Sequence, residues 1–219
     1  MIVIVEGQPN EIVAVSGSTP MIDGVIGGEW GDASSLSFNN TEVFVKQDGE
    51  NLYIAFNVSD ATINADENVH VFFDVNHDVG TSPKSDDILI GVFRNGTLIE
   101  RYLVNGTDVN ATGWTASVSN TTQMWQAEFN ITYSKINVTA GVTKTLGVAF
   151  EVIDYSFPYL WQSWPHDLRD GDPLDPSRWG EMISTGYNWI PELTSFLVLP
   201  LFTITLLLAV FISRGKHLK

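Results

Sequence analysis

Cysteine is absent from this chain of 219 residues, and formal positive charge is scarce. Without a thiol, the chain forms no disulfide, no thiolate zinc site, no Cys-x-x-Cys-His haem attachment and no cysteine nucleophile. Lys and Arg number 11 against 26 Asp and Glu, which gives a net charge of −15. Because phosphate contacts need cations, this balance excludes non-specific nucleic-acid binding. It suits divalent cations, a basic partner or a saline exterior.

The chain also lacks the short motifs of common enzyme classes. It contains no Gly-x-Ser-x-Gly elbow, no His-Glu-x-x-His zinc motif and no phosphate-binding loop. A pair of catalytic carboxylates stays open, since sequence spacing does not reveal one. We therefore predict a binding or structural protein rather than an enzyme.

One long apolar run is present, at the C-terminal end. Residues 193–212 carry no formal charge, and Arg214, Lys216 and Lys219 follow. Twenty apolar residues rising about 1.5 Å each cover roughly the 30 Å of a bilayer core, and the cations behind them indicate a cytoplasmic end. We predict an extracellular domain over residues 1–187, a linker over 188–192, a transmembrane helix over 193–212 and a cytoplasmic basic tail over 213–219.

Eight Asn-x-Ser/Thr sequons add to the extracellular interpretation, since such sites accept N-linked glycans on secreted surfaces. The alternative is that Asn and Thr are simply common in polar loops. With no cysteine and with glycans expected, we predict an archaeal cell-surface glycoprotein. The predicted glycosylation sites are Asn39, Asn57, Asn95, Asn105, Asn110, Asn120, Asn130 and Asn137.

Short alternating apolar and polar segments dominate the extracellular part. Asp48-Gly49 and Asn95-Gly96 mark hairpin turns between such segments. We predict an all-β fold, an antiparallel β-sandwich of the jelly-roll type, followed by one transmembrane helix. Residues 154–187, rich in Pro, Gly and aromatics, are expected to be irregular. The predicted strands are 43–46, 52–58, 69–75, 87–93, 97–104, 114–118, 124–131 and 146–153.

An ordered set of motifs resembles family 9 carbohydrate-binding modules and the related DOMON-like domains. The resemblance spans residues 22–181 and implies a β-sandwich, structural calcium and a sugar clamped between two tryptophans. The fold also hosts haem binding and plain structural roles. The tail with Pro191-Glu192 resembles archaeal C-terminal sorting signals. The motifs are Ile22–Trp30 (Asp-Gly…Glu-Trp), Asn51–Asp60 (Leu-Tyr-Ile-Ala…Asp), Val69–Asp74, Trp125–Phe129 (Trp-x-Ala-Glu-Phe), Trp164-Pro165 and Trp179-Gly180.

A calcium site is predicted in the loop after residue 73. Asp74, Asn76 and Asp78 present oxygen side chains at alternate positions, and Asp86 and Asp87 follow. Ca²⁺ takes six to eight oxygen ligands, which such a loop supplies, although the Glu that completes an EF-hand is missing. The alternative is an acidic hairpin loop built from Asx-turns.

The aromatic stretch after Asp154 is the candidate ligand site. Flat rings stack on the apolar faces of sugars, while carboxylates and amides bind their hydroxyls. The alternative is that the stretch folds over the edge of the sandwich as core, as expected for Trp30, Trp125 and Trp179. The predicted ligand-binding residues are Trp161, Trp164, Tyr155, Tyr159, Asp154 and Gln162.

Three functions follow, from different classes. The first is a membrane-anchored, N-glycosylated cell-surface module that contacts carbohydrate, an envelope glycoprotein or other surface-layer and membrane subunits. The second is a DOMON-type electron-transfer domain holding haem b, although no spacing among its histidines and methionines selects an axial pair. The third is a structural envelope subunit, or an accessory subunit of a membrane complex, without its own ligand.

Overall fold

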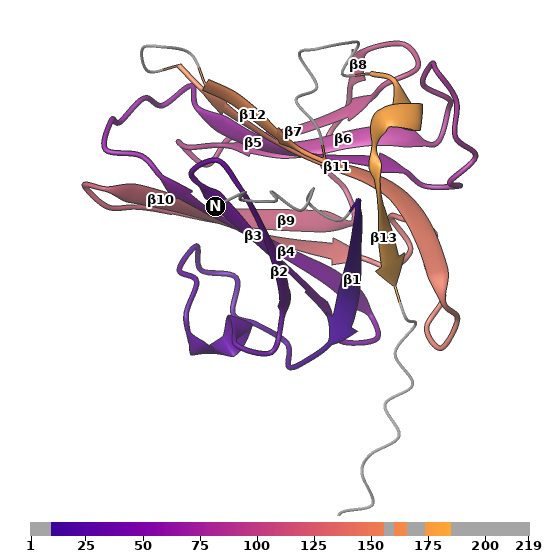
Figure 1. The fold of residues 1–219 in the computed structure, drawn as a ribbon, viewed down its shortest axis with the longest axis horizontal. Coiled ribbons are helices and arrows are strands. Elements are labelled where there is room, and N and C mark those ends of the chain that lie inside the picture. The colour runs from indigo at the N-terminus through magenta and orange to yellow at the C-terminus, as the bar shows by residue number, and fades with distance from the viewer. Residues whose placement is uncertain (1–9, 156–159, 166–173, 185–219) are drawn as a thin grey trace, which may run out of the picture. The chain divides into compact units, whose positions relative to one another are not determined.

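The computed structural model describes residues 10–155, 160–165 and 174–184 (Figure 1). Internal contacts divide the chain into two units, Met1–Tyr187 and Asn188–Lys219. The predicted linker, membrane span and basic tail all lie outside the described residues. Within the described ranges, no helix is long and apolar enough to cross a membrane.

Thirteen strands and two short 3₁₀ helices build the described domain. All eight predicted strands are present, with ends that differ by at most two residues. The elements are β1 (Glu11–Ser16), η1 (Gly28–Trp30), β2 (Ser34–Phe38), β3 (Thr41–Gln47), β4 (Asn51–Ser59), β5 (Asn68–Asp74), β6 (Asp87–Phe93), β7 (Leu98–Tyr102), β8 (Thr107–Asp108), β9 (Trp114–Asn120), β10 (Met124–Thr132), β11 (Lys144–Asp154), β12 (Leu160–Trp164), η3 (Pro176–Arg178) and β13 (Gly180–Ser184).

The strands form two layers, which Figure 1 shows facing each other. The first sheet has the order β8-β7-β6-β5-β11-β13, with β12 also paired to β11. The second sheet has the order β3-β4-β10-β9, with β2 also paired to β3. Strand β1 joins them, because its first four residues pair with β13 and its last two residues pair with β3.

Strand β1 corrects the prediction of a purely antiparallel sandwich. Both of its pairings are parallel, whereas the other strand pairs described are antiparallel, so the sheet is mixed. The prediction of an irregular segment over residues 154–187 is also wrong for β12 and β13. Both strands are short and flanked by Pro and Gly, so their local sequence carries little strand signal, and pairing with β11 decides their conformation.

The core lies between the two sheets, as the alternating pattern predicts. Phe56 of β4 packs edge-on against Phe150 of β11 across the layers, with ring centroids 5.8 Å apart. Trp164 of β12 is 1% exposed and its ring lies 5.6 Å from that of Phe150. Because side chains alternate along a strand, the remaining residues of each sheet lie on its outer face.

The outer face of the second sheet is covered by the loop that carries η1. Trp30 of this loop is 2% exposed and packs with Tyr53 and Ala55 of β4. The Trp30 indole donates to Glu128 Oε1 at 2.6 Å, and the backbone N–H groups of Asp23 and Gly24 donate to the other carboxylate oxygen. The chain thus closes this face with its own loop.

Candidate functional site: a cavity on the first sheet

The outer face of the first sheet carries a different set of side chains. Strand registers place Arg101, Leu89, Phe72 and Ala149 in one row across β7, β6, β5 and β11. The next row runs through Gly91, His70, Glu151 and Ser163, from β6 to β12. Apolar and ionisable side chains therefore meet on one exposed layer.

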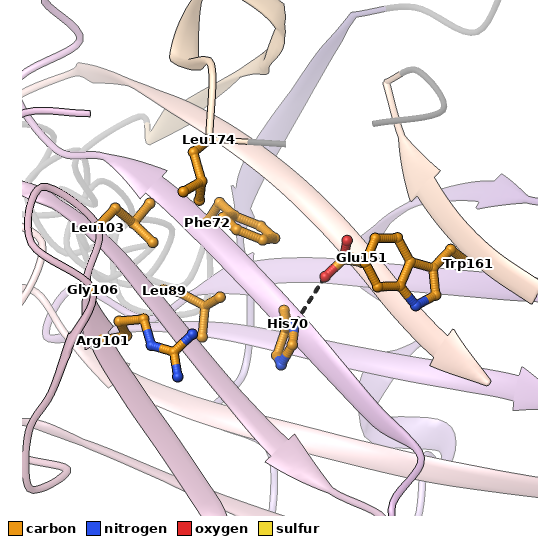
Figure 2. A pocket seen from close by; sticks show the side chains of 9 residues that line it. All are labelled: His70, Phe72, Leu89, Arg101, Leu103, Gly106, Glu151, Trp161 and Leu174. Carbon is orange, nitrogen blue, oxygen red and sulfur yellow. Dashed lines mark hydrogen bonds and ion pairs between the residues drawn. The ribbon is translucent and has the colours of Figure 1, made fainter. Parts of the chain in front are cut away.

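Five members of these rows, Arg101, Leu89, Phe72, His70 and Glu151, line a half-open cavity of about 210 Å³ (Figure 2). Phe72, Leu89 and Leu103 belong to an apolar cluster that Trp179 completes, with the Trp179 and Phe72 rings 5.6 Å apart. The lining residues are His70, Phe72, Leu89, Arg101, Leu103, Gly106, Glu151, Trp161 and Leu174.

His70 and Glu151 form a hydrogen-bonded pair in this cavity. His70 Nδ1 lies 2.9 Å from Glu151 Oε2, and the two residues are 8% and 5% exposed. Because a carboxylate accepts only, Nδ1 carries the proton, and Nε2 is left as an acceptor in the neutral ring and a donor in the charged ring. Nε2 is buried and has no partner among the described residues.

Gly91 makes room for this histidine. A Cβ atom at Gly91 would lie 2.4 Å from His70 Cδ2, far inside contact distance. The His70 ring therefore leans over the neighbouring strand, and any side chain at position 91 would displace it. The absence of a side chain on β6 thus positions a histidine on β5.

Trp161 and Arg101 stand at the rim. Figure 2 shows Trp161 beside Glu151, and Arg101 on the other side of His70. Trp161 is 38% exposed, in contrast to the buried Trp164 three residues later. Arg101 Nε donates to Asp108 Oδ1 at 2.6 Å, an exposed ion pair between β7 and β8.

The residues predicted to bind ligand separate into three groups. Trp161 lines the cavity, and Tyr155 is 43% exposed, next to β11. Trp164 is buried in the core, which agrees with the alternative prediction that this aromatic stretch packs as core rather than binding a ligand. Asp154 and Gln162 are also buried, and Gln162 Oε1 accepts from Thr41 Oγ1 at 3.3 Å. Tyr159 lies outside the described residues.

Sequence reasoning missed most of the cavity floor. Phe72, Glu151 and His70 fall within predicted strands, but none of them was assigned to a site. The available signal was the breach of apolar–polar alternation, since β5 and β11 are apolar on one face and still carry Phe72, His70 and Glu151 on the other.

The predicted calcium loop brings three of its five residues together. Carboxylate oxygens of Asp74, Asp78 and Asp86 all lie within 4.8 Å of one another. Asp74 also accepts backbone N–H bonds from Asp78 and Val79, each at 3.2 Å. Lys84 forms an ion pair of 2.7 Å with Asp78, which offsets part of the negative charge. The set supplies the hard oxygen ligands that Ca²⁺ takes.

Asp87 and Asn76 stand beside this group. The Asn76 backbone N–H donates to Asp86 Oδ2 at 2.9 Å, which shapes the loop. Asp87 is 1% exposed and accepts from Lys84 N, while its Oδ1 is buried without a partner in the described structure. Burial, together with the charges of the neighbouring aspartates, raises the pKa of Asp87 to about 6. A bound divalent cation would relieve the repulsion between Asp87 and these aspartates.

A second carboxylate group lies at the end of the sandwich. Oxygens of Asp60, Glu67 and Asp154 lie within 4.8 Å of one another, and all three are buried in the group. Arg94 Nη1 donates to Asp60 at 2.6 Å and to Glu67 at 2.5 Å. Burial raises the pKa of Glu67 to about 7, although Arg94 opposes this. The triad has the geometry of a metal site, with a guanidinium already bonded to two of its members.

Structural comparison shows what this arrangement resembles. The chain matches a family 9 carbohydrate-binding module of Caldicellulosiruptor kristjanssonii in complex with cellotriose, with TM-score 0.65 and 20% identity over 83% of this chain and 96% of that one. The chain has the fold of a family 9 carbohydrate-binding module. The predicted resemblance is therefore confirmed at the level of fold.

Two further structures agree. The glucose complex of the Caldicellulosiruptor kristjanssonii module also has TM-score 0.65 and 20% identity, and covers 83% of this chain and 99% of that one. A putative carbohydrate-binding protein from Bacteroides uniformis has TM-score 0.57 and 14% identity over 80% of this chain and 98% of that one. No family model and no curated protein matches the sequence.

Proposed function

We propose that this protein is a non-catalytic carbohydrate-binding module that holds a sugar on the outer face of its first sheet. The observation that carries the proposal is the half-open cavity in which the exposed Trp161 ring lies beside the His70–Glu151 pair. The structures with this fold include complexes of another module with glucose and with cellotriose, which supports the same ligand class.

The lining of the cavity suits a sugar. Phe72, Leu89 and Leu103 offer an apolar floor to the CH groups of a sugar ring, and Trp161 offers an aromatic wall. His70 Nε2 and Glu151 offer polar atoms, and a hydroxyl can donate to one and accept from another. At about 210 Å³ the cavity is smaller than the 300–1,000 Å³ typical of larger ligands, so it fits one terminal residue rather than a chain.

Binding to a glycan array by the full-length protein tests this proposal, followed by calorimetry with the best ligand. Trp161→Ala is expected to weaken affinity tenfold or more, because one stacking face is lost. Met21→Ala is the matched control, since Met21 is 69% exposed in the loop that covers the second sheet. A module that binds no glycan would instead support a ligand-free structural subunit.

Calcium has a structural role in this proposal. Bound by Asp74, Asp78 and Asp86, the ion would brace the loop between β5 and β6. That loop contacts the wall of the cavity, because Ser177 N donates to Gly80 O at 3.0 Å and Leu174 of the same segment lines the cavity. A cation in the loop would therefore steady one side of the sugar site.

The proposed setting is a glycosylated cell surface. Six of the eight sequon asparagines are exposed, whereas Asn57 and Asn130 are half-buried. We expect glycans on the exposed six, and mass spectrometry of protein from its natural host tests this. Residues 193–212 would anchor the module with the Lys219 end inside, so a C-terminal tag on intact cells should resist external protease unless the tail is removed by sorting.

The haem alternative has less support from the described residues. His70 Nε2 faces the cavity, but no methionine or second histidine is among the described residues that line it, and Met182 is fully buried in the core. An absorption spectrum of the purified protein separates the two functions. A Soret band would favour electron transfer, and its absence together with glycan binding would favour the carbohydrate module.

A further inference from the structure

We propose that the cavity selects sugars that carry an anionic group, a carboxylate or a sulfate, and that Arg101 binds this group. The proposal rests on the carbohydrate-binding function proposed above and adds the ligand class. Arg101 is the residue that would make the site discriminate between a neutral hexose and its uronic acid.

The charges that line the cavity carry this inference. Glu151 already accepts a hydrogen bond from His70 Nδ1, so one of its carboxylate oxygens is engaged inside the site. Among the described residues, Arg101 is the one Lys or Arg that lines the cavity. Its Nε bonds Asp108, while Nη1 and Nη2 are not engaged by any described residue. A guanidinium whose two terminal nitrogens are free to donate can bind a planar carboxylate through two parallel hydrogen bonds.

The position of Arg101 fits one end of a sugar ring. Arg101 and Leu89 are register partners on β7 and β6, and Leu89 pairs with Phe72, so the guanidinium stems from the edge of the apolar floor. Figure 2 places Trp161 on the far side of His70 from Arg101. A ring lying over Phe72 and Leu89 would thus have its aromatic contact at one end and a cation at the other.

Opposing charges limit the size of the effect. The chain carries a net charge of −15, and Asp74 and Asp87 lie two residues along β5 and β6 from the floor. Repulsion from more distant carboxylates is screened beyond about 8 Å at physiological salt. The Arg101 contact is direct and escapes most of that screening. Asp108 competes with the ligand for the same guanidinium, so removing the charge of Asp108 tests the role of Arg101.

The experiment uses the full-length protein on a panel of matched neutral, uronic and sulfated glycans, then calorimetry on the best pair. The wild type is expected to bind the acidic member at least fivefold more tightly. Arg101→Gln should remove that preference, because the loss of affinity should fall at least fivefold more heavily on the acidic member than on the neutral one. Arg101→Lys should retain part of it, because charge remains but the fork is lost.

Asp108→Asn is the matched control. It frees the guanidinium from its competitor, so the preference for the acidic glycan should stay or increase. Equal binding of neutral and acidic members, unchanged by Arg101→Gln, would overturn the inference and leave the carbohydrate function standing. Binding to no glycan at all would overturn both. The sulfated members show whether the accepted anion is a carboxylate or a sulfate.

Discussion

The two outer faces of the sandwich each hold a buried glutamate, and the two glutamates differ in their hydrogen-bond partners and in their access to solvent. Glu128 on the second sheet is enclosed by the η1 loop and accepts from the Trp30 indole and two backbone N–H groups. Glu151 on the first sheet has His70 as its hydrogen-bond donor in the described structure, and it lines an open cavity. One face is closed by the chain itself, and the other is open to a ligand.

The difference shows what separates a structural polar network from a binding site. Burial raises the pKa of Glu128, although its three donors lower it, and these donors all belong to one short loop. In the cavity, His70 Nε2 and the Arg101 terminal nitrogens remain without described partners. Polar groups that the fold leaves unpaired are available to recognise another molecule.

Removing the aromatic cover of the second sheet should have the largest effect. Trp30→Ala takes away a ring that is 2% exposed and the donor to Glu128. We expect a loss of about 3–5 kcal/mol in the free energy of unfolding, from the cavity and the unpaired carboxylate together. Denaturant unfolding measures it. Sugar affinity of the folded fraction should be unchanged, and a change there would contradict the separation of the two faces.

Calcium should stabilise the folded protein through the loop between β5 and β6. A ligand that binds the folded state alone adds about 2.7 kcal/mol at a hundredfold excess over its Kd. Calcium should therefore raise the melting temperature, and chelator should reverse the rise. Asp74→Asn should abolish the response, whereas Glu11→Gln, an exposed acidic residue on β1, should preserve it. An identical melting curve with calcium and with chelator would refute the site.

The carboxylate group at the end of the sandwich should make stability depend on pH. Burial raises the pKa of Glu67 from 4.5 to about 7, so the folded protein favours the protonated form of this side chain. The stability that protonated Glu67 adds to the folded state is complete below pH 4.5 and is lost as the pH rises through 7. Glu67→Gln should flatten this slope and remove a loss on the order of 2 kcal/mol between pH 5 and pH 9. Unfolding curves across this range test it, and an unchanged slope would argue against the shift.

Trp161 should matter least for stability, in contrast to Trp30. Its ring is 38% exposed on β12, so Trp161→Ala is expected to change the free energy of unfolding by about 0.5 kcal/mol or less. The same protein should bind sugar tenfold or more weakly. Trp164→Ala serves as the buried counterpart on the same strand and should lose several kcal/mol. Equal stability losses for both variants would show that the cavity wall is core.

The fold was accessible to sequence reasoning where the apolar alternation is clean. Strands such as β4 and β10 alternate along their whole length, and their ends were predicted within two residues. Strands β12 and β13 were missed because Pro and Gly surround them and only the pairing with β11 holds them extended. Parallel pairing of β1 was missed for a similar reason, since its partners β13 and β3 are distant in sequence.

The site was only partly accessible. Asp74 and Asp78 were predicted from local spacing, because one loop carries both, and Asp86 follows at the end of the same loop. Trp161 and Trp164 looked alike in sequence, and strand parity on β12 separates them, one to each face. His70, Gly91 and Glu151 come from three strands, so nothing in their spacing connects them.

By itself the sequence determined an all-β sandwich fold, the oxygen-rich loop between two strands and the lack of any cysteine chemistry, because each depends on residues close together in the chain. Tertiary structure alone decided which outer face stays open. A loop some hundred residues before Glu128 closes one face, while β12 and the η3 segment leave a cavity over the other. Such contacts join distant segments, and no local pattern encodes which segment will cover which face.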